Sequence, residues 1–176
     1  MGYSDVGEFK NKKINTPNID SLSKDGQVWT DFYASSAVCT PSRAGLLTGR
    51  LPVRNGLYGD QIAVFFPNSK RGLPSEETTI AEVFQDNGYK TAIFGKWHRG
   101  HRQEFLPLPN GFDEYSGLIC SNDMWPVDYD GNPLSGTKKS YYPPMSFWEN
   151  NKPSEVISTL KDQGQLTKKI TERAVN

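Results

Sequence analysis

The sequence predicts an α/β fold in which some strands of the sheet are parallel. Segments with helical periodicity and clear end signals are followed by short segments rich in β-formers, and this order repeats between residues 16 and 94. Repetition of helix and strand is typical of layered α/β proteins. The 176 residues have room for one domain with a real core.

The first predicted elements are a capped helix and a strand. Thr16 is a suitable N-cap, Pro17 occupies the first helical position and Gly26 ends the helix. Residues 27–34 alternate between short stretches of polar and apolar side chains and contain many β-formers, which predicts a strand.

Two short helices are expected next. Residues 42–48 follow Pro41 and end at Gly49, so they predict a helix of about two turns. Residues 79–82 read Thr-Ile-Ala-Glu, a capping-box pattern that opens a helix through Asn87.

The rest of the chain is predicted as a strand, a long excursion and a helix. Residues 89–94 are a short apolar strand, whereas residues 99–155 are rich in Pro, Gly, Asn and aromatics and are expected to be irregular. The last helix is expected from Gln165, with apolar residues spaced four apart, and it has no stop signal before Asn176. We therefore expect the chain to be cut from a longer protein.

Composition excludes several classes of partner. Twenty basic and twenty acidic side chains give no formal net charge, so no nucleic acid or other polyanion is implied. No apolar run is long enough to cross a membrane, and no signal peptide is visible. Two cysteines, Cys39 and Cys120, do not form a disulfide framework, so the compartment stays open.

Residues 39–50 read C-x-P-S-R-x-x-x-L-T-G-R and place a cysteine at a helix start. There, unpaired backbone N–H groups and the positive end of the helix dipole favour an anion. Arg43 lies one turn on and can bring a permanent positive charge to the same end. A buried structural cysteine is the alternative reading of Cys39 taken alone.

Residues 88–98 form a second cluster, which ends in Gly-Lys-Trp-His. Lys96 and His98 are two positions apart at the end of a predicted strand, so we expect them on one face at the edge where α/β sheets bind ligands. A cation beside a histidine suits an anionic substrate.

Together these segments resemble the two signatures of the type I sulfatases. Residues 72–82 and 106–112 are similar to the arylsulfatase A branch of that family. The resemblance implies the alkaline-phosphatase-like α/β fold, with a mixed or parallel sheet flanked by helices. It also implies hydrolysis of sulfate monoesters by a formylglycine made from the cysteine.

The resemblance also implies a role for each matching residue. Cys39, as formylglycine, would be the nucleophile and a metal ligand, and Arg43 would stabilise its hydrate. Lys96 would hold the sulfate, and His98 would hydrogen-bond the formylglycine hydroxyl. Ser121 is the counterpart of a serine that contacts substrate in the arylsulfatase A branch.

The implied cofactors are calcium and the formylglycine modification. The implied partners are a formylglycine-generating enzyme and a small-molecule, glycan or lipid sulfate ester. Members of the family are lysosomal, secreted or periplasmic.

The chain departs from the family pattern at both ends. The paired aspartates that bind calcium are absent, and Asp5 matches a different position. The later Asp-Asn pair, second histidine and second lysine have no counterpart before Asn176. We therefore expect residues 1–176 to be the N-terminal portion of a catalytic domain, with no activity alone. The alternatives are an inactive truncated paralogue and a phosphatase or phosphonate hydrolase of the same superfamily.

Overall fold

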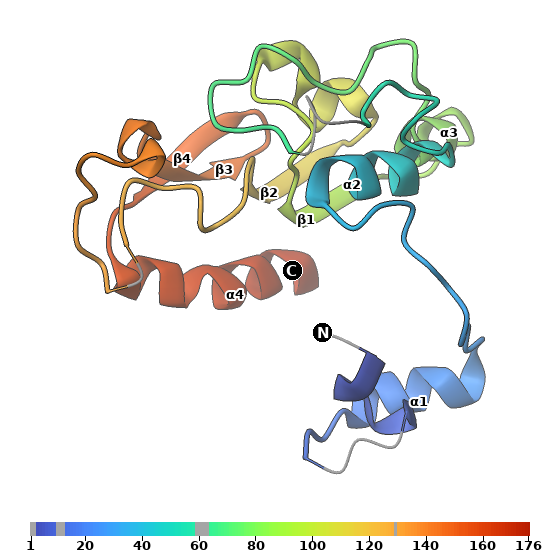
Figure 1. Cartoon of the computed structure of the whole chain (residues 1–176). Helices are drawn as coiled ribbons and strands as arrows, with labels where there is room; N and C mark the ends of the chain where they lie inside the picture. Colours follow the sequence, from blue (N-terminus) through green and yellow to red (C-terminus); the bar gives the residue numbers. More distant parts are fainter. Residues whose placement is uncertain (1–2, 10–12, 59–63, 129) are drawn as a thin grey trace. The chain divides into compact units, whose positions relative to one another are not determined.

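The computed structural model describes residues 3–9, 13–58, 64–128 and 130–176, which form two compact units, Met1–Tyr33 and Ala34–Asn176 (Figure 1). The first unit contains helix α1 (Pro17–Asp25) and two 3-10 turns, Tyr3–Asp5 and Gly7–Phe9. Helix α1 confirms the predicted first helix, with Thr16 and Gly26 as its caps.

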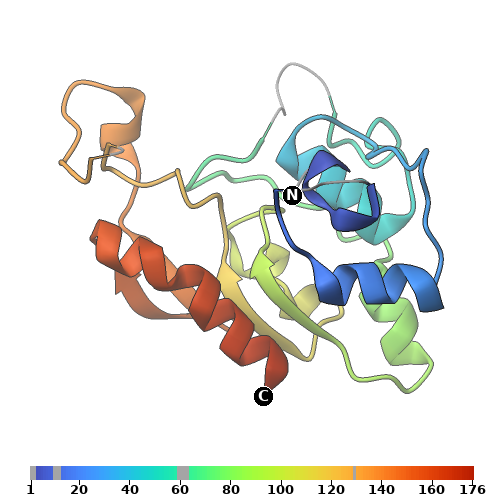
Figure 2. The same cartoon turned by 90° about the horizontal axis from the view of Figure 1, so that it is seen from below.

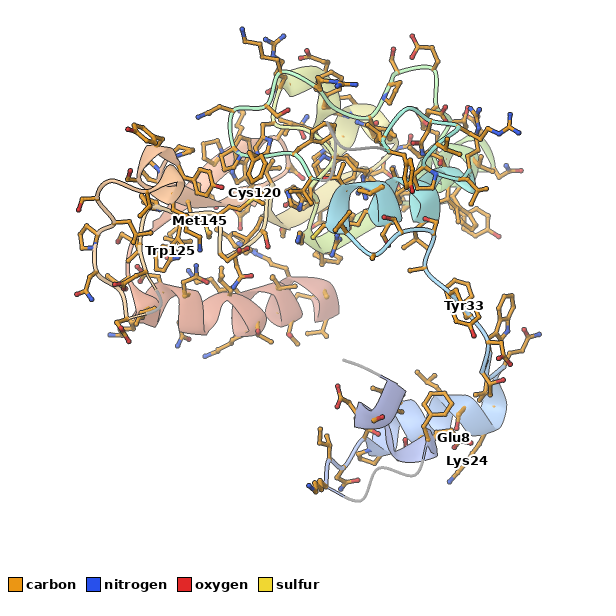
Figure 3. The ribbon with its side chains drawn as sticks, viewed as in Figure 1. Glu8, Lys24, Tyr33, Cys120, Trp125 and Met145 are labelled. Carbon is orange, nitrogen blue, oxygen red and sulfur yellow. The ribbon has the colours of Figure 1, made fainter. Side chains whose placement is uncertain are left out.

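The strand predicted over residues 27–34 is wrong. These residues form no strand, and the side chains of Trp29, Phe32 and Tyr33 are exposed (Figure 3 labels Tyr33). A β-former becomes a strand only when a neighbouring strand takes up its backbone hydrogen bonds, and the first unit offers none among its described residues.

The second unit is built on a mixed four-stranded sheet with the order β1-β2-β3-β4. Strand β1 (Ala92–Lys96) is parallel to β2 (Glu114–Leu118). Strands β3 (Met145–Glu149) and β4 (Lys152–Ile157) continue the sheet antiparallel. The predicted mixed sheet is confirmed.

The expectation that residues 99–155 are irregular is wrong in part, because they include β2, β3 and the start of β4. Gly117 shows why β2 is hard to recognise. A Cβ atom there would lie 1.9 Å from the Gly95 carbonyl oxygen, so only glycine lets β1 and β2 approach this closely. The glycine weakens the local β pattern while it makes the pairing possible.

Helix α4 (Leu160–Val175) runs along one face of this sheet, as Figures 1 and 2 show. It buries Leu166 against this face, with Leu118, Met145, Phe147 and Ile157. Helices α2 (Cys39–Thr48) and α3 (Ile80–Asp86) join a second cluster on the other face, which includes Leu47, Ala81, Trp97, Phe112 and Tyr115. Tyr115 and Leu118 lie in different clusters because they are three positions apart along β2.

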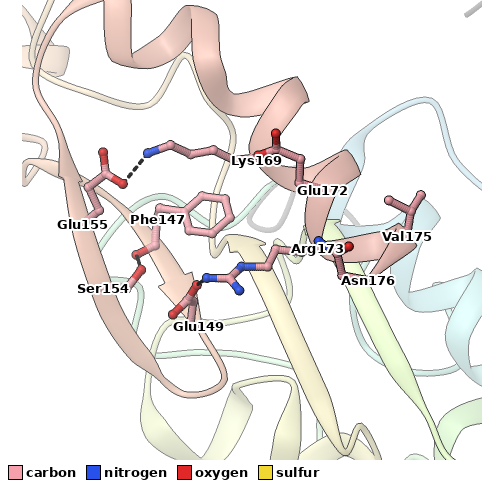
Figure 4. A pocket seen from close by; sticks show the side chains of 9 residues that line it. All are labelled: Phe147, Glu149, Ser154, Glu155, Lys169, Glu172, Arg173, Val175 and Asn176. Carbon is pink, nitrogen blue, oxygen red and sulfur yellow. Dashed lines mark hydrogen bonds and ion pairs between the residues drawn. The ribbon is translucent and has the colours of Figure 1, made fainter.

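Helix α4 begins five residues before the predicted Gln165. Its N-terminus is a capping box. The Thr159 hydroxyl accepts a hydrogen bond from the Asp162 N–H, and the Asp162 carboxylate accepts one from the Thr159 N–H. Figure 4 shows how the helix meets the β3–β4 hairpin through two ion pairs, Lys169 with Glu155 and Arg173 with Glu149. They line a surface cavity of about 540 Å³. Exposed pairs of this kind contribute little to stability.

The predicted capping box of α3 is confirmed. Thr79 is fully buried, its side chain accepts from the Glu82 N–H at 3.2 Å, and the Glu82 carboxylate accepts from the Thr79 N–H at 2.6 Å. The Thr79 hydroxyl also donates to the Asn110 carbonyl at 2.9 Å, which ties α3 to the loop before β2.

We predict that Thr79→Ala lowers the free energy of unfolding by about 1–3 kcal/mol, because it removes a cap and leaves a buried carbonyl without its donor. Urea denaturation measures the change. Thr159→Ala is the matched control, since it removes the same kind of cap from an exposed site. Equal losses in the two variants would contradict the role given to the Asn110 contact.

Candidate active site

Helix α2 begins at Cys39, three residues before the predicted start. The sequence expectation that this cysteine lies at a helix N-terminus is therefore confirmed. Val38 precedes the helix in an extended conformation, and Gly49 ends it in the left-handed region, where its N–H donates to the Gly45 carbonyl at 3.0 Å. A depression of about 490 Å³ opens beside Cys39, lined by Ala34, Ser36, Ala37, Val38, Ser42, Arg43 and Leu46.

The structure brings Lys96 directly to Cys39. Lys96 is the last residue of β1, and its Nζ atom lies 3.1 Å from the Cys39 Sγ atom. The two residues are 57 positions apart in the chain. An ammonium group at the carboxyl end of a strand thus faces the side chain at the start of a helix. The ammonium group and the helix N-terminus both favour negative charge at this point.

Arg43 connects α2 to the end of the same strand. Its Nη1 atom donates to the Lys96 carbonyl oxygen at 2.5 Å. Burial lowers the pKa of the Arg43 guanidinium, and the neighbouring Cys39 side chain acts in the opposite direction. The guanidinium therefore carries its charge next to Cys39 while it holds the backbone that presents Lys96.

Thr40 is a positioning residue that the sequence analysis missed. Its hydroxyl donates to the His98 carbonyl oxygen at 3.0 Å and accepts from the Phe65 N–H at 3.0 Å, and the side chain is fully buried. One hydroxyl therefore joins α2, the end of β1 and the segment at residue 65. Its place directly after Cys39 in the first signature was the only available signal.

Backbone and side-chain hydrogen bonds fix the position of His98. The residue is fully buried, and its backbone N–H donates to the Ile119 carbonyl at 2.8 Å. The ring Nε2 atom lies 2.7 Å from the Phe65 carbonyl oxygen. A carbonyl oxygen only accepts, so Nε2 carries the proton. The remaining ring nitrogen, Nδ1, has no partner among the described residues and is a free acceptor.

The environment keeps this imidazole neutral. Burial is the main cause that lowers the pKa of His98 to about 4. The nearby Lys96, His101 and Arg43 lower it further, and the hydrogen bond to Phe65 opposes the shift. The backbone at His98 has φ of 64°, an uncommon conformation for a residue other than glycine. The strand predicted over residues 89–94 is observed as β1 at Ala92–Lys96, so Lys96 ends the strand and His98 lies beyond it.

Arg99 adds a third positive charge that the sequence analysis also missed. Its guanidinium carbon lies 3.7 Å from the centroid of the Trp97 ring, a cation–π contact. The side chain is buried, and its Nε and Nη2 atoms have no hydrogen-bond partner in the described part of the chain. Burial and the charge of Arg43 lower the pKa of Arg99. Its position next to His98 was the signal.

Ser121 lies near the site without touching Cys39 in any contact that the described residues show. Its side chain hydrogen-bonds Asp123 and, as the leading cause, lowers the pKa of that carboxyl group. The charges of Lys139 and Lys96 also lower the pKa of the Asp123 carboxyl group. Ser121 directly follows Cys120, beyond the carboxyl end of β2.

The described residues do not form a metal site. No group of three or more His, Cys, Asp or Glu side chains that could hold an ion occurs among residues 3–9, 13–58, 64–128 and 130–176. The described cluster around Cys39 instead consists of cationic and neutral side chains, which do not fit a divalent cation.

Residues 1–176 match the family model described as Sulfatase. The chain belongs to the sulfatase family.

Similar proteins agree with this family. Arylsulfatase A of Bos taurus is 48% identical over 128 residues, which are 72% of this chain and 25% of the relative. Arylsulfatase G of Rattus norvegicus is 45% identical over 131 residues, 74% of this chain and 24% of the relative. The chain thus spans about a quarter of these relatives' length.

The structure also resembles that of the sulfatase PsFucS1 from Pseudoalteromonas sp.. The match has a TM-score of 0.79 and 26% sequence identity, and it covers 99% of this chain and 38% of that one. The predicted alkaline-phosphatase-like α/β fold is therefore confirmed. None of the relatives named here is a phosphatase or phosphonate hydrolase.

No helix in the described parts of the chain is long and apolar enough to cross a membrane.

We predict that the stability of the fold falls as the pH is lowered from about 6.5 to about 5. The pKa of His98 is about 4 in the folded chain and about 6.5 when exposed, so the unfolded state binds more protons in this window. Chemical denaturation at a series of pH values measures the slope.

His98→Gln should flatten this slope because glutamine does not titrate. The exposed neighbour Gln103 provides the control, since Gln103→Ala should keep the wild-type slope. His101, whose pKa is also about 4, contributes the remainder. A wild-type slope in His98→Gln would contradict a neutral buried His98.

Proposed function

We propose that this chain carries the nucleophile and sulfate-binding part of a sulfate-ester hydrolase. The contact between Lys96 Nζ and Cys39 Sγ at the start of α2 supports this most directly. It places the residue that the family signature marks for conversion to formylglycine beside a cation and a helix N-terminus. The names of the relatives, arylsulfatases A and G and N-acetylgalactosamine-6-sulfatase, point to the same chemistry.

The residues around Cys39 fit a formylglycine at this position. One hydroxyl of the hydrated aldehyde would attack sulfur while the bond from sulfur to the ester oxygen breaks, so that the alcohol leaves with a proton. The second hydroxyl would then lose its proton and form the C=O bond as the carbon–oxygen bond to sulfate breaks, which releases sulfate and regenerates the aldehyde. In the structure the Cys39 Sγ atom stands where the side-chain oxygens would lie. Lys96, 3.1 Å away, would bind a sulfate oxygen and stabilise the charge that develops on it.

His98 would act on the proton of the nucleophile. Its neutral ring presents Nδ1 as an acceptor, because Nε2–H is already committed to the Phe65 carbonyl. A neutral acceptor near a hydroxyl can take its hydrogen bond and its proton. Arg43, fixed on the Lys96 carbonyl, would hold negative charge on the nucleophile.

A divalent cation accompanies this chemistry in the family, and we propose calcium. A hard cation of this kind needs about six or more oxygen ligands, and the described residues do not provide such a set. No step of the mechanism above is therefore assigned to it. We also expect no turnover from residues 1–176 alone.

The broader assignments follow from the same proposal. Residues 1–176 would be the N-terminal portion of a catalytic domain, and Cys39 would be the substrate of a formylglycine-generating enzyme. The substrate would be a small-molecule, glycan or lipid sulfate ester. A lysosomal, secreted or periplasmic location would suit a protein of this kind.

We predict that Cys39 is converted to formylglycine when the chain is co-expressed with a formylglycine-generating enzyme. Mass spectrometry of the tryptic peptide ending at Arg43 should show loss of the thiol mass and reaction with a hydrazide probe. Cys120 is the internal control and should remain a thiol. An unmodified Cys39 in a host that converts a reference sulfatase would contradict the proposal.

We predict a ranking of variants in the chain extended to the length of its relatives. Lys96→Ala should lower kcat and raise KM, with a loss of about 10²–10³ in kcat/KM for one charge-stabilising donor. His98→Ala should act mainly on kcat. Ser121→Ala should act mainly on KM, by about 0.5–1.5 kcal/mol for a neutral hydrogen bond.

The exposed Lys90, near the start of β1, provides the matched control for charge removal. Lys90→Ala should leave both constants at their wild-type values. If Ser121→Ala were as damaging as Lys96→Ala in a folded protein, the division of roles would be wrong.

A further inference from the structure

A second cavity lies beyond the carboxyl end of β2, and the sulfate chemistry described above does not use it. Its volume is about 250 Å³. Its walls come from the end of β2, strand β3 and the segments around residues 67, 101, 124 and 143. Figure 3 labels two of the lining residues, Cys120 and Met145.

Backbone hydrogen bonds join this cavity to the candidate active site. The carbonyls of Leu118 and Ile119, which line it, accept from the N–H groups of Trp97 at 2.9 Å and His98 at 2.8 Å. On the other side, Pro67 lines the cavity two residues after Phe65, whose carbonyl lies against the His98 ring. The segments that hold His98 are therefore also walls of the cavity.

The side chains at the cavity differ from those at the active site. Among the described residues its lining contains no Lys, Arg, Asp or Glu. Most of these residues are apolar: Pro67, Leu118, Ile119, Met124, Pro143, Pro144, Met145 and Trp148. Burial raises the pKa of the Cys120 thiol to about 11, so this side chain is neutral. Such a surface favours an uncharged occupant.

His101 is the polar group without a partner in this cavity. Both ring nitrogens are buried, and neither has a hydrogen-bond partner among the described residues. Burial lowers the pKa of His101 to about 4, so the ring is neutral near pH 7. It then offers one N–H donor and one acceptor nitrogen, the pair of functions that a hydroxyl group matches.

We propose that this cavity binds the alcohol half of the sulfate ester as an uncharged ring, and that His101 selects rings that carry a second hydroxyl group. The inference rests on the proposed function. A sulfate ester has an anionic head and a neutral body. The cations at Cys39 would bind the anionic head, and the neutral cavity beside His98 would bind the neutral body. The volume suits one or two rings.

Direct binding of alcohols tests the cavity without the hydrolytic reaction. Calorimetry with the chain extended to the length of its relatives would compare phenol with catechol, resorcinol and hydroquinone. At least one of the three diols should bind about two- to tenfold more tightly than phenol, as expected for one neutral hydrogen bond. No preference for any diol would overturn the role of His101.

Variants of His101 identify the group that reads the hydroxyl. His101→Phe keeps a ring but removes both polar atoms, so the preference for the diol should disappear while phenol still binds. His101→Asn restores a donor and an acceptor and should recover part of the preference. Arg102→Ala is the matched control, because Arg102 is the exposed neighbour and does not line the cavity. A diol preference that survives His101→Phe would contradict the proposal.

Turnover of the corresponding esters separates this inference from the proposed function. In His101→Phe the preferred diol monosulfate should show a raised KM, and phenyl sulfate should be hydrolysed as in the wild type. Diol binding that depends on His101, with no ester hydrolysed, would retain the cavity as a site for the alcohol and refute the hydrolase. Hydrolysis of the esters without any dependence on His101 would support the hydrolase and refute the role of His101 in the cavity.

Discussion

Two hydrogen bonds hold the first turns of α2 against the end of β1, and the arrangement of the site depends on them. The Thr40 hydroxyl binds the His98 carbonyl, and the Arg43 guanidinium binds the Lys96 carbonyl. Because both acceptors are backbone atoms, they fix the path of the chain at β1 relative to the helix start. That path brings the Lys96 ammonium to 3.1 Å from the Cys39 sulfur.

The parallel pairing of β1 and β2 extends this constraint to a second site. The ladder continues beyond the strands through Trp97 and His98, whose N–H groups donate to the carbonyls of Leu118 and Ile119. The same edge of the sheet therefore carries a cationic cluster at β1 and a neutral cavity at β2. Carboxyl ends of neighbouring parallel strands are where α/β folds bind ligands, because the side chains that follow them converge there. A substrate with a charged head and a neutral body matches such an edge.

Burial decides the electrostatics of this edge. Three cations, Arg43, Lys96 and Arg99, occur together, and burial lowers the pKa values of both arginines. Desolvation also keeps His98 and His101 neutral, so that each presents hydrogen-bonding atoms instead of a further charge. Cationic groups held this way favour an anion more than they would in water, since the surrounding dielectric is low. The two imidazoles, whose pKa values burial lowers to about 4, thus differ in the groups that surround them.

The sequence by itself determined the family and the presence of the four α-helices, and it singled out Cys39, Arg43, Lys96 and His98 as candidates, since these depend on local spacing and on end signals such as Thr79 and Gly49. The tertiary structure decided the rest. The segment at residues 27–34 has the composition of a strand yet forms none, whereas β2, which contains the close approach at Gly117, does form one. Strands exist only where a partner takes up their backbone hydrogen bonds, and residues 57 positions apart meet only through such pairing. The roles of Thr40 and His101 arise in the same way, because a hydroxyl or an imidazole has no recognisable pattern until its neighbours are in place.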